Sequence, residues 1–181
     1  MTETTYDAVV YDLDGTLVHL NVDWGSVATD VLEVYASAAV DVPSRDLWDL
    51  LGSAGDYGLD GEVEEAIATH EREGAKTAER LAYADEVLTR EIPVGVCSLN
   101  CEDACRIALE RQGLLEAVEV IVGRDTVETK KPDPEPLLYA AEGLSATPER
   151  TLFVGDTRRD ELTATRAGTA FEYVDGGPVE Y

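Results

Sequence analysis

The stretch "VVYDLDGTLV", residues 9–18, decides the fold. The run Ala8–Leu13 is apolar enough to predict a first strand that is buried on both faces. Two acids one residue apart, Asp12 and Asp14, stand at the end of that strand. A carboxylate pair in this position suits two tasks, which are holding a hard cation and performing acid–base or nucleophilic chemistry beside it.

The composition indicates a globular protein. With 181 residues, 44% of them hydrophobic, the chain can form one well-cored domain or a core domain with a small insertion. It has no apolar run of about 18 residues, as a membrane span requires, and its first residues, "MTETTYDA", lack the apolar segment of a secretory signal. The cysteines Cys97, Cys101 and Cys105 are odd in number and spaced by four, which favours reduced thiols over disulfides or a zinc site. We therefore expect a cytoplasmic protein.

The charge balance is strongly acidic, with 38 acidic residues against 14 basic ones and a net charge of −24. Such a surface repels nucleic acid and anionic membranes, so we expect neither as a partner. The acid-rich, lysine-poor composition also resembles that of proteins from salt-loving archaea. Molar salt shortens the Debye length to about 3 Å, which weakens the repulsion among the protein's own acidic side chains. The composition therefore predicts a halophilic archaeal source.

From residue 92 onward, the hydrophobic pattern alternates between strands and helices. The predicted strands are 92–99, 117–123, 151–156 and 170–174, and the predicted helices are 101–113, 133–144 and 159–168. This alternation predicts an α/β fold with a Rossmann-like parallel sheet and right-handed crossovers. In such sheets the ligand site lies beyond the carboxyl ends of the strands.

The residues between the first two predicted strands have a helical pattern. Apolar residues recur at helical spacing over 27–38, and the segment after Pro43 starts a helix with Ser44 as its candidate N-cap. The segment 62–88 is helical in pattern apart from an interruption near Gly74. An inserted helical cap over the edge of the sheet explains this break in the α/β alternation.

We therefore expect two domains, a core of residues 1–18 and 90–181 and a helical cap of residues 19–89. Caps of this type can pair, so the sequence leaves monomer and homodimer open. The aromatic residues expected in the interior of the cap are Trp24, Trp48 and Tyr57.

Polar side chains end three of the predicted strands. Ser98 ends the second strand and Asp156 ends the strand "TLFVG", as Asp12 and Asp14 end the first. Asp160 adds another acid four residues after Asp156. Several acids at one place repel one another unless a cation joins them, and Mg²⁺ prefers oxygen ligands. The sequence therefore predicts a magnesium site at this edge of the sheet.

Other groups expected nearby fit a phosphoryl group. Lys131 in "KKPDP" supplies a positive charge, Ser98 a hydroxyl, and the helix starting near Cys101 its N-terminal amides. Arg158 and Arg159 begin the next helix, where they face solvent or touch a substrate anion.

These residues lie in four segments, "DLDGT", "VGVCSLN", "KKPDPEP" and "FVGDTRRD". The set resembles the four ordered motifs of the haloacid dehalogenase-like (HAD) hydrolase superfamily, and the insertion after the first motif resembles its helical-cap subclass. That subclass includes phosphoglycolate phosphatase-like enzymes. The resemblance spans essentially the whole chain, and each motif falls at the expected strand end or loop.

The resemblance implies a reaction and a role for each acid of the first motif. Asp12 matches the nucleophile that attacks phosphorus and becomes an aspartyl phosphate. Asp14 matches the general acid that protonates the leaving alkoxide and then activates water. The implied function is a Mg²⁺-dependent phosphatase that hydrolyses a small phosphate monoester, either phosphoglycolate-like or a sugar phosphate. Its partner is therefore a small phosphorylated metabolite.

The resemblance also implies which residues bind the ligands. Mg²⁺ would be held by the Asp12 carboxylate, the backbone carbonyl of Asp14 and Asp156, with Asp160 supporting it directly or through water. The residues implied to bind the phosphoryl group are Gly15, Thr16, Ser98, Asn100 and Lys131.

Two positions depart from the family pattern. Asn100 stands two residues after Ser98, whereas relatives often place asparagine directly after the serine or threonine. His19 stands where many relatives have an aspartate. Of the two adjacent lysines we assign Lys131, because it directly precedes the proline of "KKPDP".

Three alternatives stay open. A sugar phosphomutase shares all four motifs. A 2-haloacid dehalogenase of the same superfamily attacks carbon and needs neither a metal nor the acid at position 14, so Asp14 argues against it. A non-catalytic phosphate-binding regulator is the third, since receiver domains also combine clustered acids with a hydroxyl and a lysine. Those domains lack the "DLDGT" order and a helical insertion of this size.

Overall fold

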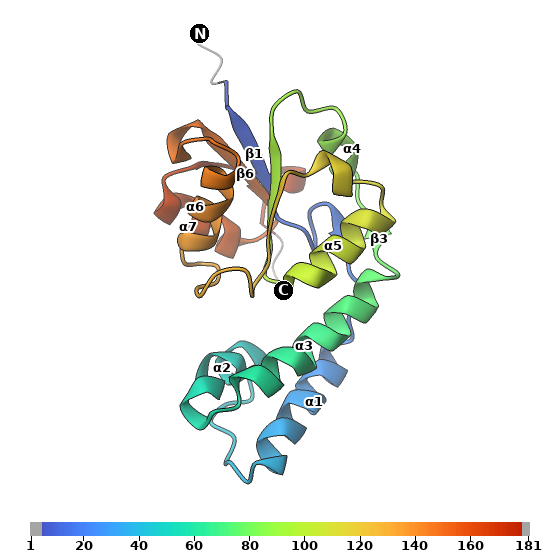
Figure 1. The fold of residues 1–181 in the computed structure, drawn as a ribbon, viewed down its shortest axis with the longest axis vertical. Helices are drawn as coiled ribbons and strands as arrows, with labels where there is room; N and C mark the ends of the chain where they lie inside the picture. The colour runs from blue at the N-terminus through green and yellow to red at the C-terminus, as the bar shows by residue number, and fades with distance from the viewer. Residues whose placement is uncertain (1–4, 179–181) are drawn as a thin grey trace.

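The computed structural model describes residues 5–178, which form a sheet-based core and a helical part beside it (Figure 1). The main sheet has the strand order β5-β4-β1-β6-β7, and every neighbouring pair is parallel. Its strands are β1 (Ala8–Tyr11), β4 (Val94–Cys97), β5 (Val120–Val122), β6 (Thr151–Gly155) and β7 (Ala170–Tyr173). The first strand is therefore central, and the predicted α/β fold with a parallel sheet is confirmed.

Helices cover both faces of this sheet. They are α5 (Glu102–Arg111), α6 (Glu135–Gly143) and α7 (Arg158–Ala167). Val9 and Tyr11 of β1 pack in one hydrophobic cluster with residues of α5, and Ala8 and Val10 pack in another with residues of α6 and α7. Because successive side chains of a strand point to opposite faces, a strand covered on both sides must be apolar throughout. This requirement explains the apolar run before Asp12.

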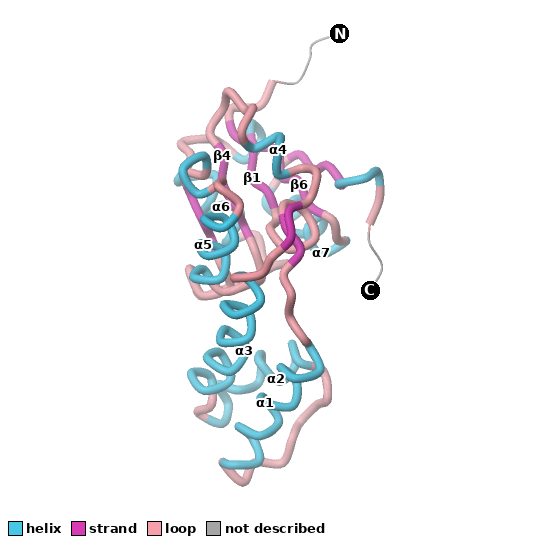
Figure 2. Tube along the Cα trace, turned by 90° about the vertical axis from the view of Figure 1, so that its right-hand side faces the viewer, coloured by secondary structure: helices cyan, strands magenta, loops and turns pink. Residues whose placement is uncertain are grey.

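The residues between β1 and β4 include a three-helix cap. Its helices are α1 (Trp24–Ser37), α2 (Leu47–Ser53) and α3 (Asp60–Ala75). They pack around their own cluster, which contains Val27, Val31 and Ile67. Figures 1 and 2 show this cap at one end of the molecule, with α3 running from the cap to the sheet-based core. The short elements are β2 (Val18–His19), β3 (Glu79–Arg80), α4 (Ala84–Val87) and the 3-10 turns Ala54–Tyr57, Leu115–Ala117, Pro148–Arg150 and Val174–Gly176.

The two connections between cap and core lie side by side, because β2 pairs with β3 in antiparallel fashion. After β3 the chain packs against the core: Ala78, Ala84 and Val87 belong to the same hydrophobic cluster as β1 and α5. These residues lie within the range 19–89 that the sequence pattern assigned to the cap. The cap's own hydrophobic cluster ends with α3.

One local prediction about the cap is wrong. The N-cap of α2 is Asp46, whose Oδ1 accepts hydrogen bonds from the amides of Trp48 and Asp49 at 2.9 and 3.1 Å, whereas Ser44 lies before it in the chain. The interruption predicted near Gly74 agrees with the end of α3 at Ala75, after which the chain turns back to the core and forms β3. The error at α2 arises because two residues that can cap a helix, Ser44 and Asp46, stand close together in the sequence.

Cys97, Cys101 and Cys105 are buried free thiols. Desolvation raises the pKa of Cys97 and of Cys101 to about 12. Within 5–178, every helix is too short or too polar to cross a membrane.

Candidate active site

The predicted polar residues gather at the carboxyl edge of the sheet. Asp12 follows β1, Ser98 follows β4 and Asp156 follows β6, and all three are buried. The amide of Asp12 donates to the carbonyl of Val154 at 2.8 Å, which continues the β1–β6 ladder to the site. The parallel arrangement of three neighbouring strands thus brings together side chains that are up to 144 positions apart in the sequence.

Lys131 joins this group from the loop before α6. Its buried ammonium donates to Asp12 Oδ1 at 2.8 Å and to Asp160 Oδ1 at 2.6 Å. Burial alone would lower the pKa of Lys131, but the negative charges of Asp12 and Asp160 outweigh it and raise that pKa. The lysine is therefore a fixed positive charge against the predicted nucleophile, and it is Lys131 that makes these contacts.

A triangle of carboxylates offers a cation site. One oxygen each of Asp12, Asp156 and Asp160 lies within 4.8 Å of the other two. Asp156 Oδ1 is buried and has no hydrogen-bond partner within residues 5–178. Since a buried acceptor without a partner is costly, and Mg²⁺ takes carboxylate oxygens, these residues fit a magnesium ion.

The three acids do not contribute equally. Asp160 Oδ1 accepts from Lys131, and its Oδ2 accepts from the hydroxyl and the amide of Thr157 at 2.7 and 3.2 Å, in the capping box of α7. Both oxygens of Asp160 are thus engaged, while Asp156 keeps one oxygen without a partner among the described residues. This arrangement favours Asp12 and Asp156 as direct ligands and Asp160 as a supporting acid.

Electrostatics at the carboxylate triangle also suits a cation. Burial raises the pKa of Asp12 well above its usual range; the charge of Lys131 opposes this shift, and those of Asp160 and Asp156 add to it. Burial is likewise the main reason that the pKa of Asp156 is raised. A divalent ion would favour the ionised forms of both carboxyl groups.

Gly15 is required by the approach of Asp156. Its φ angle is +86°, and a Cβ atom at this position would lie 2.2 Å from Asp156 Oδ2. The predicted turn after the acids therefore brings the main chain against the Asp156 carboxylate. Thr16, also predicted at the site, is buried, and its hydroxyl lies 3.5 Å from Asp12 Oδ2.

Asp14 lines the cavity but lies outside the carboxylate triangle. It is partly exposed, its Oδ1 accepts from the amide of Leu20 at 2.9 Å, and His19 Nδ1 lies 3.9 Å from the same oxygen. Burial raises the pKa of Asp14 although the hydrogen bond from Leu20 lowers it. A carboxyl group that holds its proton more readily than usual beside the nucleophile suits a general acid.

A cavity of about 710 Å³ lies between the core and the cap. Asp12, Asp14, Ser98, Asn100, Lys131, Asp156 and Asp160 line it from the core. Trp24 and Trp48 line it from the cap, so the prediction that they are interior cap residues is wrong. Each tryptophan lies in the first turn of its helix. Apolar residues at helical spacing indicate which side of a helix is buried, but they do not indicate which end of the helix lies next to the sheet-based core.

A cation–aromatic contact joins α2 of the cap to α7 of the core beside this cavity. The two tryptophan rings are 6.2 Å apart between centroids, and the Arg159 guanidinium carbon lies 5.8 Å from the centroid of Trp48. Arg158 and Arg159 are exposed and line the same cavity, so the alternative that they reach a substrate anion stays open. Tyr57, expected inside the cap, is 45% exposed and meets Tyr35 edge to face.

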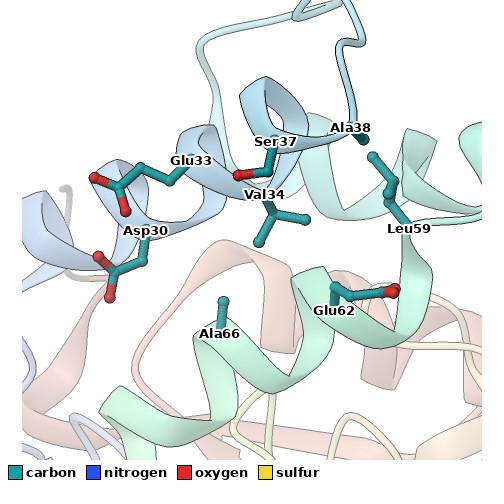
Figure 3. Close-up of a pocket in the computed structure, with 8 residues that line it drawn as sticks. All are labelled: Asp30, Glu33, Val34, Ser37, Ala38, Leu59, Glu62 and Ala66. Atoms are coloured by element: carbon teal, nitrogen blue, oxygen red, sulfur yellow. The ribbon is translucent and has the colours of Figure 1, made fainter.

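A second hollow of about 520 Å³ lies on the cap between α1 and α3 (Figure 3). Its lining includes the acids Asp30, Glu33 and Glu62 and contains no basic residue among those described. Three carboxylates without a compensating charge repel a phosphate anion. The cavity at the sheet edge is therefore the candidate active site.

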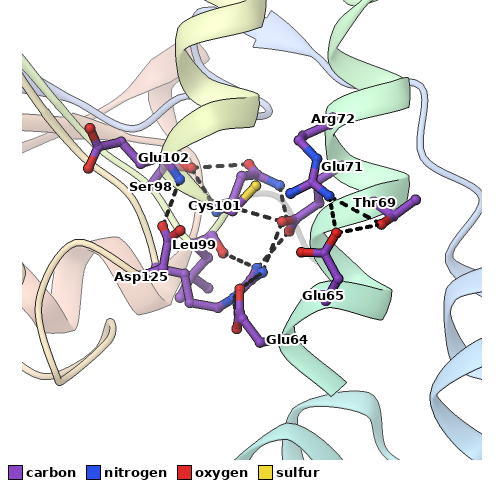
Figure 4. A network of polar contacts seen from close by, with 12 residues as sticks. Glu64, Glu65, Thr69, Glu71, Arg72, Ser98, Leu99, Cys101, Glu102 and Asp125 are labelled. Carbon is purple, nitrogen blue, oxygen red and sulfur yellow. Dashed lines mark hydrogen bonds and ion pairs between the residues drawn. The ribbon is translucent and has the colours of Figure 1, made fainter. Parts of the chain in front are cut away.

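One phosphate-binding prediction is wrong. The amides at the start of α5 are not free, because Cys101 N donates to Glu71 Oε2 at 3.0 Å and Glu102 N donates to Asp125 Oδ1 at 2.7 Å (Figure 4). Ser98 does lie at the cavity as predicted. Its hydroxyl donates to Asn100 Oδ1 at 3.1 Å and accepts from the amide of Asn100 at 3.0 Å.

Comparison with known proteins agrees with these features. The model of the family "Haloacid dehalogenase-like hydrolase" matches residues 9–174. A phosphoglycolate phosphatase of Rhodospirillum rubrum is 34% identical over 189 residues, which cover 89% of this chain and 76% of that one. The pyrophosphatase PpaX of Bacillus pumilus is 29% identical over 180 residues, with coverages of 93% and 83%. The structure of a HAD-superfamily hydrolase, subfamily IA, variant 1, from Geobacter sulfurreducens superimposes with a TM-score of 0.60 at 25% identity, covering 92% of this chain and 88% of that one. The chain therefore belongs to the haloacid dehalogenase-like hydrolases.

Proposed function

We propose that this hydrolase is a Mg²⁺-dependent phosphatase that acts on a small phosphate monoester, phosphoglycolate-like or a sugar phosphate. The observation that carries the proposal is the pairing of Asp12 with Lys131 beside the unpartnered oxygen of Asp156. The pair gives a nucleophile held next to a positive charge, and the free oxygen gives a place for a cation. The names of the Rhodospirillum and Bacillus relatives, a phosphatase and a pyrophosphatase, also support it.

The metal would be held by the carboxylates of Asp12 and Asp156 and by the backbone carbonyl of Asp14, with Asp160 supporting the site. When bound, Mg²⁺ supplies positive charge that offsets the negative charge of the phosphoryl oxygens. Lys131 adds a second positive charge and keeps Asp12 oriented. Ser98 offers a hydroxyl, and Gly15 and Thr16 bring the main chain close to the phosphoryl group.

The first chemical step joins Asp12 to phosphorus. An oxygen of its carboxylate forms a bond to phosphorus while the bond from phosphorus to the ester oxygen breaks. Asp14 gives its proton to the departing alkoxide, which leaves as the alcohol. The product on the protein is an aspartyl phosphate at Asp12.

The second step restores the carboxylate. Asp14, now ionised, takes a proton from a water molecule whose oxygen attacks phosphorus. The bond between phosphorus and Asp12 breaks, and inorganic phosphate is released. The cap covers one side of this cavity, and this cover would limit the water that reaches the intermediate.

We also propose the setting in which the enzyme works. The net charge of −24 supports a halophilic source, and three buried, unpaired cysteines support a reducing cytoplasm. The cavity that Lys131 and Ser98 line supports a small phosphorylated metabolite as partner, and the acid-rich surface speaks against nucleic acid and membranes. The helical insertion supports the helical-cap subclass, acting as monomer or homodimer.

The test is phosphate release from a panel of phosphate monoesters, phosphoglycolate and p-nitrophenyl phosphate included, in about 2 M KCl with and without Mg²⁺. We expect Mg²⁺-dependent release that Asp12→Asn abolishes. Asp41→Asn, which makes the same change at an exposed cap position, is the control and should keep wild-type activity. If the folded, Mg²⁺-binding protein releases phosphate from no ester, the proposal is wrong, and the mutase and the regulator become the leading alternatives.

A further inference from the structure

A buried ion pair that the mechanism does not use joins the cap helix α3 to the core. Glu71 of α3 is completely buried, and Arg124, which follows β5, is 6% exposed. Arg124 Nη1 donates to Glu71 Oε1 at 2.7 Å, and Nη2 donates to Oε2 at 3.0 Å, so the pair is bidentate. Figure 4 shows Glu71 reaching from α3 to the loop that carries Ser98, Leu99 and Cys101.

Glu71 also accepts two hydrogen bonds from that loop. Asn100 Nδ2 donates to Oε1 at 3.1 Å, and the amide of Cys101 donates to Oε2 at 3.0 Å. Arg124 donates in addition to the Leu99 carbonyl at 2.6 Å and to Glu64 of α3 at 2.6 Å. Glu71 therefore holds the loop 98–101 from the cap side at Asn100 and Cys101, and Arg124 holds it from the core side at Leu99.

These contacts fix the orientation of Asn100. Because its Nδ2 donates to Glu71, its Oδ1 faces the opposite way, where it accepts from the Ser98 hydroxyl at 3.1 Å. Its amide donates to the same hydroxyl oxygen at 3.0 Å. Ser98 and Asn100 line the active-site cavity, and Glu71 is not among the described residues that do. Glu71 thus acts on the cavity only through its neighbours.

A purely structural role would not need this arrangement. Burying two charges costs hydration, and apolar residues of similar volume are often as stabilising as a buried ion pair. What the charged pair provides is direction, since a carboxylate that accepts four hydrogen bonds fixes the position of each donor. The donors here belong to the loop that carries Ser98 and to the arginine that holds it.

We propose that Glu71 is a positioning residue for the phosphate-binding loop. It orients Asn100 and, through Asn100, fixes the Ser98 hydroxyl oxygen at the cavity, where the hydroxyl proton can turn from Asn100 Oδ1 to a phosphoryl oxygen, while Arg124 holds the Glu71 carboxylate. The inference rests on the proposed function in one respect only, that the ligand of Ser98 is a phosphoryl group.

The experiment compares two double variants, each of which replaces an ion pair between a glutamate of α3 and an arginine. Glu71→Leu/Arg124→Met removes both buried charges together and leaves neither member of the pair alone. Glu65→Leu/Arg72→Met removes a more exposed ion pair of the same residue types, which makes no hydrogen bond to the loop 98–101 among the described residues. For each protein we would measure the thermal midpoint, kcat and KM, and the binding of inorganic phosphate and of Mg²⁺ by calorimetry.

We expect the Glu71→Leu/Arg124→Met protein to fold and to bind Mg²⁺ as the wild type does, because Asp12 and Asp156 are untouched. Its affinity for inorganic phosphate and its kcat/KM should both fall about tenfold, the size of effect seen when partners of binding groups are removed. The Glu65→Leu/Arg72→Met protein should match the wild type in both. Unchanged phosphate affinity in the folded Glu71→Leu/Arg124→Met protein would overturn the inference.

Two single variants add an independent test. Glu71→Gln keeps the side-chain volume and one acceptor oxygen, so it should fold and lose about threefold in phosphate affinity. Asn100→Ala should weaken phosphate binding in the wild type and weaken it little further in the Glu71→Leu/Arg124→Met protein, because Glu71 acts through Asn100. If the two changes reduce the phosphate affinity by independent factors, Glu71 does not act through Asn100 and this part of the inference is wrong.

The phosphate titration separates the two proposals. If no ester is hydrolysed but phosphate binding depends on Glu71 as described, the proposed function fails and the positioning role stands. If the esters are hydrolysed and phosphate binding ignores Glu71, the reverse holds.

Discussion

The carboxylate of Asp12 stands between the ammonium of Lys131 and the carboxylates of Asp156 and Asp160. The reactivity of Asp12 depends on how much positive charge balances the negative charges of these acids. Lys131 alone cannot balance three acids, and the buried oxygen of Asp156 shows where a second positive charge fits. Individual side chains therefore test both the cation site and the lysine.

Lys131→Met should destabilise the protein because it leaves Asp12 and Asp160 buried without their positive partner. We expect the free energy of unfolding to fall by about 3 kcal/mol without Mg²⁺ and by less with it, since the cation restores positive charge. Urea unfolding with and without Mg²⁺ measures both. Lys130→Met is the control: this side chain makes no ion pair within 5–178, and its removal should change little. Equal losses at both positions would contradict the role of Lys131.

Gly15→Ala should weaken metal binding through a clash. The new Cβ would lie 2.2 Å from Asp156 Oδ2, so the carboxylate must move, and we expect the affinity for Mg²⁺ to fall about tenfold or more. Gly58→Ala is a matched control, because Gly58 has a similar φ of +69° and no atom lies within 4 Å of the place that its Cβ would take. It should cost about 1 kcal/mol of backbone strain and leave Mg²⁺ affinity unchanged. Calorimetric titration with Mg²⁺ distinguishes the two; a normal affinity in Gly15→Ala would count against Asp156 as a ligand.

The elements that the sequence predicted best are the fully buried strands. The strands β1, β4 and β6 are covered on both faces, so each leaves an apolar run that ends at a polar residue. Parallel topology then places Asp12 and Asp156 together without further information. The family motifs supplied the rest of the expected set, including Lys131.

Features that depend on tertiary contact could not be predicted. Glu71 and Arg124 are 53 positions apart, and in a chain this acidic a glutamate on a helix is indistinguishable from a solvated one. Trp24 and Trp48 fit an apolar stripe whether it faces the cap interior or the cavity. The start of α2 was misjudged for the same reason, because Ser44 and Asp46 are equally good caps until the helix axis is known.

Another prediction concerns the N-terminus of α7, because Asp160 belongs both to its capping box and to the candidate active site. Thr157→Ala removes the hydroxyl that donates to Asp160 Oδ2 at 2.7 Å and accepts from the Asp160 amide at 3.3 Å. We expect about 1 kcal/mol less stability and a lower kcat, because Asp160 also holds Lys131. Thr165→Ala, on the exposed side of the same helix, should leave both quantities near wild type. Thermal unfolding and phosphate release measure them, and loss of stability without loss of kcat would limit Thr157 to helix capping.

The molecule as a whole carries a net charge of −24, and its active site must admit an anion. At low ionic strength the acidic surface repels both itself and a phosphate ester, whereas molar salt confines the field of each charge to about 3 Å. Buried groups such as Lys131 and Asp12 are screened much less, so the pairing inside the site persists while the surface repulsion disappears.

We therefore expect the thermal midpoint and kcat/KM to rise together as KCl increases from about 0.1 M to about 2 M at fixed Mg²⁺. Most of the change in kcat/KM should come from KM, because salt relieves the approach of the substrate and leaves the chemistry at Asp12 unaltered. Sucrose is the control: it stabilises the folded state without screening charge, so it should raise the midpoint and leave KM unchanged. A steady fall in kcat/KM over the KCl range, with the circular dichroism of the folded state preserved, would exclude adaptation to salt, and the acidic surface would then need a different explanation.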